Sequence, residues 1–148
     1  MSDSREKNYE DLVEKYPKLY ADRHASMRAT CMCWGFSCGT GWYDIIDKLS
    51  AKLEYLINVW IGENPDHADH HPRASQVKEK WGTLSFYMTS GTDIMYDVIS
   101  MAEWRSGRTC EICGEDGRPN KRGWITTLCH KCRRESYGRM YKIGFGRL

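Results

Sequence analysis

The sequence has no long apolar run. Its 148 residues include no stretch near the roughly 18 apolar residues that a membrane-spanning helix needs. The first ten residues are polar and carry no hydrophobic signal-peptide core. We therefore expect a cytoplasmic protein that does not bind a membrane.

Internal repeats and low-complexity tracts are also missing, which excludes solenoid and fibrous architectures. Charged residues make up 28% of the chain and hydrophobic residues 41%, as in globular proteins. The length suits one compact domain, or a modest core with a small appended module. The chain has seven cysteines, and in a reducing compartment clustered cysteines favour metal binding over disulfides.

Charge is divided unevenly along the chain. Residues 1–103 hold 11 Lys and Arg against 16 Asp and Glu, a net charge of −5, whereas residues 104–148 hold 11 against 4, a net charge of +7. The overall charge of +2 therefore conceals an acidic body and a basic tail. Four thiolates on one Zn²⁺ would carry a net charge of −2, and the nearby arginines would then neutralise this local negative charge.

Apolar periodicity predicts an α+β fold, with a helical body and a β-hairpin over residues 1–106. Ser4 and Thr92 are the expected N-caps, and Pro17, Gly62 and Gly107 the expected helix ends. The predicted elements are a short helix over 9–16, a long helix over 45–61, a hairpin over 76–88 that turns near Gly82, and a helix over 92–106.

The clearest motif is a pair of C-x2-C knuckles near the carboxyl end. Cys110 and Cys113 form the first and Cys129 and Cys132 the second, with 15 residues between them. Two such knuckles at this spacing are typical of a Cys₄ zinc site. Because four protein ligands leave no position for water, we expect one structural Zn²⁺ rather than a catalytic one.

Residues 107–148 are therefore predicted to form a basic zinc module. A strand over 124–128 enters the second knuckle and a helix over 133–142 follows it, an order that resembles the treble-clef zinc fingers. We expect this module to unfold without metal. Some treble clefs are HNH nucleases, but that chemistry needs further histidines, and His130 is the only one beyond His71.

A second group of cysteines is less regular. Cys31, Cys33 and Cys38, with His24, could bind another zinc ion or supply a nucleophile. Buried thiols in a tightly packed loop are the preferred interpretation, because aromatic residues such as Trp34 lie among them and free cysteine is commonly buried.

Two polar clusters have competing interpretations. His67, His70 and His71 could bind a metal, but a solvated polar loop between two prolines is favoured. The basic tail, with Trp124, Tyr137 and Tyr141 interspersed, could contact phosphates and bases, or form a solvated face that balances the thiolates. The candidate nucleic-acid contacts are Lys121, Arg122, Arg133 and Arg134, joined by Lys131, Arg139, Lys142 and Arg147.

Three stretches together resemble small uncharacterised proteins encoded by bacteriophages and prophages. They are residues 32–46 (MCWGFSCGTGWYDII), residues 76–87 (QVKEKWGTLSFY) and the segment from Cys110 to Cys132, and the likeness covers about residues 19–132. The resemblance implies expression in the cytoplasm of an infected bacterium, where proteins of this size often bind and block a host machine.

The leading hypothesis is thus a non-enzymatic, zinc-binding phage protein that binds and inhibits a host or defence protein, such as restriction or CRISPR machinery or host polymerase. The alternative is a nucleic-acid-binding zinc module that acts through the basic carboxyl-terminal segment. A third hypothesis is a hydrolase with a cysteine or metal centre near residues 31–38.

Overall fold

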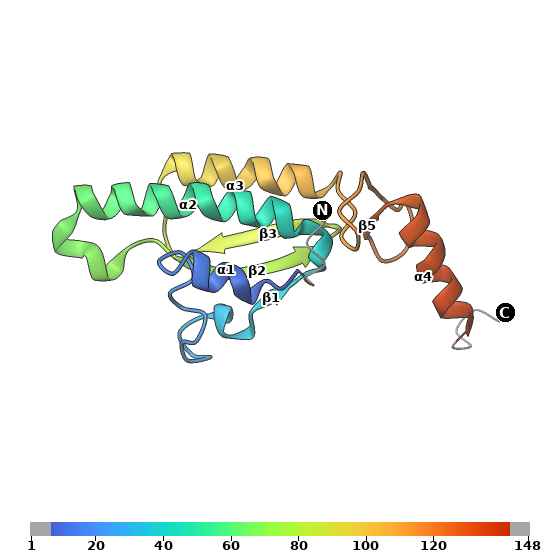
Figure 1. Ribbon diagram of the computed structural model, residues 1–148, viewed down its shortest axis with the longest axis horizontal. Helices are drawn as coiled ribbons and strands as arrows, with labels where there is room; N and C mark the ends of the chain where they lie inside the picture. The colour runs from blue at the N-terminus through green and yellow to red at the C-terminus, as the bar shows by residue number, and fades with distance from the viewer. Residues whose placement is uncertain (1–6, 143–148) are drawn as a thin grey trace.

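The computed structural model describes residues 7–142 and shows a mixed α+β fold (Figure 1). In chain order the elements are α1 (Glu10–Lys15), the 3-10 helix η1 (Cys31–Trp34), β1 (Phe36–Ser37), η2 (Thr40–Trp42), α2 (Tyr43–Glu63), η3 (Pro65–His70), β2 (Ala74–Lys80), β3 (Thr83–Met88), α3 (Asp93–Ser106), β4 (Arg118–Pro119), β5 (Thr127–Leu128) and α4 (His130–Lys142). No helix among these residues has the length and apolar character that crossing a bilayer requires.

The predicted hairpin is confirmed as β2 and β3. These strands pair antiparallel, with Val77 opposite Phe86 and Lys80 opposite Thr83, so a two-residue turn joins them. A third strand, which the sequence did not predict, is β1, and it pairs in parallel with β2 at Phe36 and Val77. The resulting sheet has the order β1-β2-β3.

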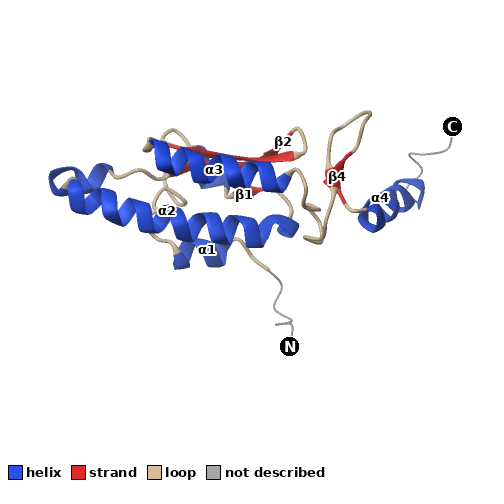
Figure 2. Ribbon diagram, turned by 90° about the horizontal axis from the view of Figure 1, so that it is seen from above, coloured by secondary structure: helices blue, strands red, loops and turns tan. Residues whose placement is uncertain are grey.

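Helices α2 and α3 confirm the two long helices of the prediction and run side by side along the sheet (Figures 1 and 2). The hydroxyl of Thr92 caps α3 as expected, because it accepts a hydrogen bond from Met95 N at 3.4 Å. The expected cap at Ser4 lies outside the described residues. Helix α2 continues one residue past Gly62, to Glu63.

Apolar side chains from α1, η1, η2, α2, α3 and the sheet meet in one core between the helices and the sheet. The largest fully buried ones include Leu12, Leu19, Tyr20, Met32, Trp42, Ile46, Leu53, Ile57, Leu84 and Met95. Helix α3 also closes the free edge of β3, since Ser106 Oγ accepts from Leu84 N at 2.8 Å and Glu103 Oε2 from Phe86 N at 3.0 Å. A protected edge resists pairing with a foreign strand.

The carboxyl-terminal part lies beyond the end of α3 (Figures 1 and 2). It contains the β4–β5 ribbon and α4, which begins at His130, three residues before the predicted start. The predicted strand over 124–128 is only Thr127–Leu128. It is shorter because the side chain of Asn120 bonds Trp124 O and Thr126 N, at 2.7 Å each, in place of a strand partner.

Candidate metal centre

The four cysteines of the two knuckles come together at one point. Cys110 and Cys113 lie on the turn after α3, Cys129 precedes α4, and Cys132 is in the first turn of that helix. Their sulfur atoms all lie within 4.8 Å of one another, and all four thiols are free. The predicted ligand set could therefore hold a metal ion.

The spacing of the sulfurs fits a tetrahedral ion. Metal–sulfur bonds of about 2.3 Å give a tetrahedron with edges of about 3.8 Å. The Sγ atoms of Cys113 and Cys129, one from each knuckle, are 3.6 Å apart. Cys110 and Cys132 are buried and Cys113 is exposed, so an ion here would lie at the edge of the module with one side toward solvent.

Backbone amides favour ionisation of one of these thiols, that of Cys110. Burial opposes ionisation of Cys110, but hydrogen bonds from the N–H groups of Cys113, Cys129 and Ile112 outweigh it and lower the pKa of the thiol to about 7. Cys132 N similarly donates to Cys129 Sγ at 3.3 Å. Burial and the neighbouring thiols raise the pKa of Cys132, and at Cys113 a hydrogen bond from Glu115 N is outweighed by the same two causes, so that its pKa is raised as well. Since a metal binds the thiolate and not the thiol, an ion here would have to displace protons from these two thiols.

The first knuckle is joined to the body by backbone contacts. Gly41 N donates to Glu111 O at 2.7 Å, and Gly39 N donates to the Glu111 carboxylate at 2.9 Å. Trp42 Nε1 donates to Thr109 O at 2.8 Å. A Cβ atom on Gly41 would lie 2.1 Å from Cys110 O, so only glycine allows this approach.

A second joint lies at the hairpin turn of the body. Thr127 Oγ1 donates to Gly82 O at 2.5 Å, and Gly82 lies against the side chain of Ile125. Neither joint was predicted from the sequence. The glycines of the Gly39-Thr40-Gly41-Trp42 segment were the available signal, because closely spaced glycines beside a tryptophan allow close backbone approach.

The second group of cysteines differs from its prediction. Cys31 is exposed and Cys33 and Cys38 are half-buried, so they are not a set of buried thiols. The reason is that η1 turns Cys31 and Trp34 outward and buries Met32 instead. Burial of Cys38 raises the pKa of its thiol to about 12, which does not favour a nucleophile at neutral pH. Within residues 7–142, clusters of three or more metal-ligating side chains occur only at the two knuckles.

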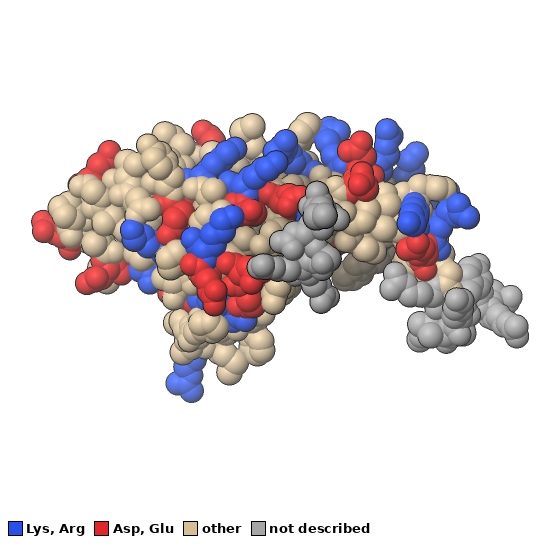
Figure 3. All heavy atoms as spheres, viewed as in Figure 1, with Lys and Arg blue, Asp and Glu red and all other residues tan. Residues whose placement is uncertain are grey.

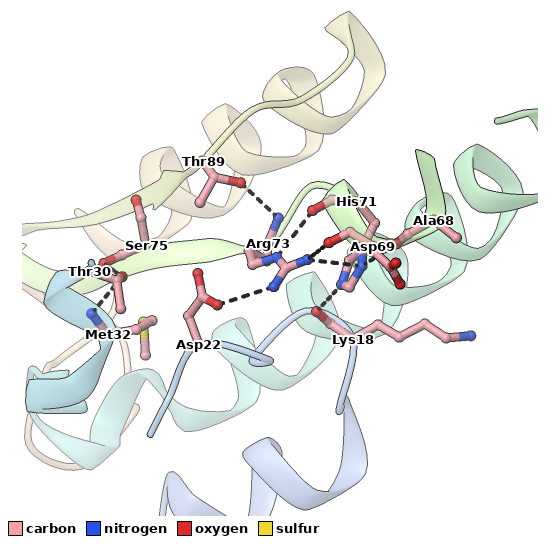
Figure 4. Close-up of polar contacts among 10 residues, drawn as sticks. All are labelled: Lys18, Asp22, Thr30, Met32, Ala68, Asp69, His71, Arg73, Ser75 and Thr89. Atoms are coloured by element: carbon pink, nitrogen blue, oxygen red, sulfur yellow. Dashed lines mark hydrogen bonds and ion pairs between the residues drawn. The ribbon is translucent and has the colours of Figure 1, made fainter. Parts of the chain in front are cut away.

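The histidines of residues 67–71 also have separate environments. His67 and His70 are exposed on η3. His71 instead lies between two chain segments, with Nε2 2.8 Å from Lys18 O and Nδ1 3.0 Å from Ala68 O (Figure 4). Beside it, Arg73 forms an ion pair with Asp22 at 3.2 Å. The cluster thus fastens η3 to the amino-terminal segment.

The basic residues of the module have mixed surroundings. Lys121, Arg122 and Arg134 are exposed, whereas Arg133 donates to Arg118 O at 2.6 Å and to Thr126 O at 3.4 Å. Arg133 therefore supports the ribbon, while the others face solvent. Lys and Arg gather at this end of the molecule, with some acidic groups among them (Figure 3). The side chains of Arg139, Lys142 and Arg147 lie outside the described part.

Comparison of the chain with models of protein families, with curated proteins and with solved structures finds no match. What the centre can do therefore follows from its own chemistry. Four thiols that approach one point from two turns can hold an ion, and they occupy every position of a tetrahedron. Such a centre fixes the two knuckles relative to each other and, through Glu111, relative to the body.

Proposed function

We propose that this chain is a non-enzymatic binding protein, that its four clustered cysteines hold a structural zinc ion in a treble-clef-like module, and that its partner is another protein. The observation that carries the proposal is an apolar stripe on the outer face of α3. The stripe consists of Ile94, Met101 and Trp104, each 60% exposed or more. Surface stripes of this kind commonly mark contacts with other proteins.

The stripe follows from the spacing of α3. Ile94, Met101 and Trp104 recur at intervals of seven and three residues, so they share one face, while Met95 and Ile99 on the other side enter the core. The body therefore buries one apolar face of α3 and leaves a second exposed to solvent. The exposed face can bury area against another molecule without disturbing the fold.

The chemistry of Trp104 also favours a protein interface. The guanidinium of Arg108 lies over its indole ring, 4.2 Å from the centroid. Tryptophan and arginine are the residue types most enriched among the few contacts that dominate protein–protein affinity. The resemblance to phage-encoded proteins leads us to seek the partner among bacterial host and defence proteins.

Zinc is the metal that four thiolates in a tetrahedron select most commonly. A closed Cys₄ site supplies no water or substrate position, which is why we assign it to stability and not to catalysis. The clustered sulfurs support a metal site here, and the sequence spacing supports zinc as the metal.

The test is capture of a partner from extracts of the bacterial host, its identification by mass spectrometry, and titration calorimetry with that protein in purified form. Met101→Lys and Trp104→Ala are expected to weaken the affinity at least tenfold, which is within the range for central interface residues. Trp34→Ala, which removes an equally exposed ring elsewhere (69%), is the matched control and should bind normally. Affinity that survives both stripe variants would refute the assignment of this surface.

A further inference from the structure

A cleft lies where the hairpin turn of the body meets the metal-binding module. It has a volume of about 390 Å³ and is lined by Glu79, Lys80, Trp81, Gly123, Trp124 and Ile125. Clefts of about 300–1,000 Å³ accommodate small ligands or single groups of larger ones. The side chains of Trp81 and Trp124 are 73% and 82% exposed, so the largest apolar groups of the cleft face solvent.

The backbone at Trp81 is unusual. Its φ is +56°, and it is the only residue other than glycine with a positive φ in the described chain. With Gly82 at φ +82°, it forms the two-residue turn between β2 and β3, where asparagine, aspartate or glycine is the ordinary first residue. A bulky side chain held in this strained conformation and also exposed contributes little to the fold. Strained residues of this kind cluster at sites that contact ligands.

The loop that carries Trp124 is held in place by hydrogen bonds. The Asn120 side chain donates to Arg122 O and Trp124 O, at 2.7 Å each, and so fixes the backbone of the loop. Gly82 contacts Ile125 and accepts from Thr127, which ties the hairpin turn to the same loop. These contacts hold the backbone near both tryptophans, which line the same cleft.

The charges beside the cleft are mainly positive. Lys80 lines the cleft, and the exposed residues Lys121 and Arg122 come directly before its lining residue Gly123 in the chain. Glu79 is the one acidic lining residue; it is half-buried and directed toward Gly82 N, 3.5 Å away. Indole faces bordered by free cations complement a chain that alternates flat rings with phosphates.

We propose that this cleft binds single-stranded nucleic acid: unpaired bases stack on Trp81 and Trp124, and Lys80, Lys121 and Arg122 contact the phosphates. The surface is separate from the α3 stripe, so this inference goes beyond the proposed function and does not depend on it. Stacking requires no particular base, and we expect little sequence preference. A base in a duplex has both faces covered, and we expect duplexes to bind more weakly.

The experiment is fluorescence anisotropy with the full, metal-loaded chain and a labelled oligodeoxythymidylate of about 12 nucleotides, within the range that small modules cover. With three phosphate contacts, the plot of log affinity against log salt should have a slope of about −2. A duplex of the same length is the competitor. No binding at the lowest salt, or equal binding of the duplex, would overturn the proposal.

The variants separate stacking from general charge attraction. Trp124→Ala and Trp81→Gly should each weaken binding by about tenfold or more. Glycine suits the left-handed turn, so Trp81→Gly should melt at the same or a higher temperature, and its loss of binding is not a loss of folding. Trp34→Ala is the matched control, with a ring of similar exposure outside the cleft. Undiminished binding by both cleft variants would refute the site.

The same variants keep this inference distinct from the proposed function. Trp81→Gly and Trp124→Ala should leave capture of the protein partner unchanged, and Met101→Lys should leave oligonucleotide binding unchanged. If instead the cleft variants abolish protein capture while the oligonucleotide does not bind, the cleft is a protein site and the nucleic-acid proposal is wrong. If the stripe variants still capture the protein partner normally while the cleft variants lose oligonucleotide binding, the proposed function fails and the nucleic-acid proposal stands.

Discussion

The body (residues 7–106) and the carboxyl-terminal module (residues 107–142) are stabilised by different means. In the body, large apolar residues from α1, α2, α3 and the sheet share one continuous core. In the module, the buried cluster consists of Cys110, Leu128 and Cys132, with Cys129 packed against it. Burial of apolar area can stabilise the first region, whereas the second has almost none to bury. The comparison teaches that the module lacks an apolar core, and on the proposed zinc site metal binding takes its place.

The contacts between the two regions differ again. Inside the body, side chains interdigitate, and the rings of Tyr9 and Phe36 stack at 4.9 Å. Between the regions, backbone groups of Gly39, Gly41 and Gly82 make most of the polar contacts. A joint of this kind depends on the position of the backbone in the knuckle, which the proposed metal ion would set.

Metal removal tests the comparison most severely. Apparent binding energies of structural zinc are about 10–16 kcal/mol, far more than so small a cluster can supply by burial. Chelation should abolish hydrogen-exchange protection in α4 and the β4–β5 ribbon, while α2, α3 and β2 stay protected. Exchange measured by mass spectrometry after chelation checks this.

Matched serine variants make the test specific. Cys129→Ser should reproduce the effect of chelation, and Cys33→Ser, which also replaces a half-buried thiol, should not. Persistent protection of α4 after chelation would mean that the module has another source of stability.

A core deletion tests the other region. Leu53 is fully buried in α2, and Leu53→Ala should lower the free energy of unfolding of the body by about 2–5 kcal/mol. Urea denaturation gives this value, with Lys52→Ala as an exposed neighbour that should change little. Metal affinity, measured by competition with a coloured chelator, should stay within about twofold. A tenfold fall in affinity would show that the two regions form one cooperative unit.

The smallest expected effect concerns the joint. In Gly41→Ala the new methyl group would lie 2.1 Å from Cys110 O, and overpacking of this kind costs about 1–3 kcal/mol. Exchange of Gly41 N and Trp42 Nε1 should accelerate, as NMR would detect. Gly62→Ala is the control: a Cβ atom there meets nothing within 4 Å, and helix stability should rise by up to about 1 kcal/mol. Unchanged exchange at Trp42 Nε1 would contradict the described joint.

The sequence predicted elements wherever a local pattern determines the structure. The stripe of α2, the alternation of β3 and the Thr92 cap each depend on residues close together in the chain. The clustering of the four cysteines was predictable for the same reason, because the geometry of a knuckle is fixed within four residues. Each of these predictions needed no knowledge of the tertiary contacts.

What the sequence did not predict depends on contacts between distant residues. Strand β1 has only two residues, and it is a strand because β2 lies beside it. The approach of Gly41 to Cys110 joins positions far apart in the chain, and no local pattern marks it. The left-handed conformation of Trp81 opposes the preference of its residue type, so propensity points away from the observed turn. Pairing of distant segments overrides local preference at each of these places.

The contact between Gly41 and Glu111 affects how the protein folds during synthesis, because its two partners are made at different times. The glycine loop leaves the ribosome about seventy residues before the knuckle that completes it. Domains that fold during translation fold from the amino end, so the body can form before the knuckle that contacts its glycine loop has been made. On the proposed zinc site, acquisition of the ion would be the last step of maturation. A cell starved of zinc would then accumulate molecules whose carboxyl-terminal module is unfolded and open to proteolysis.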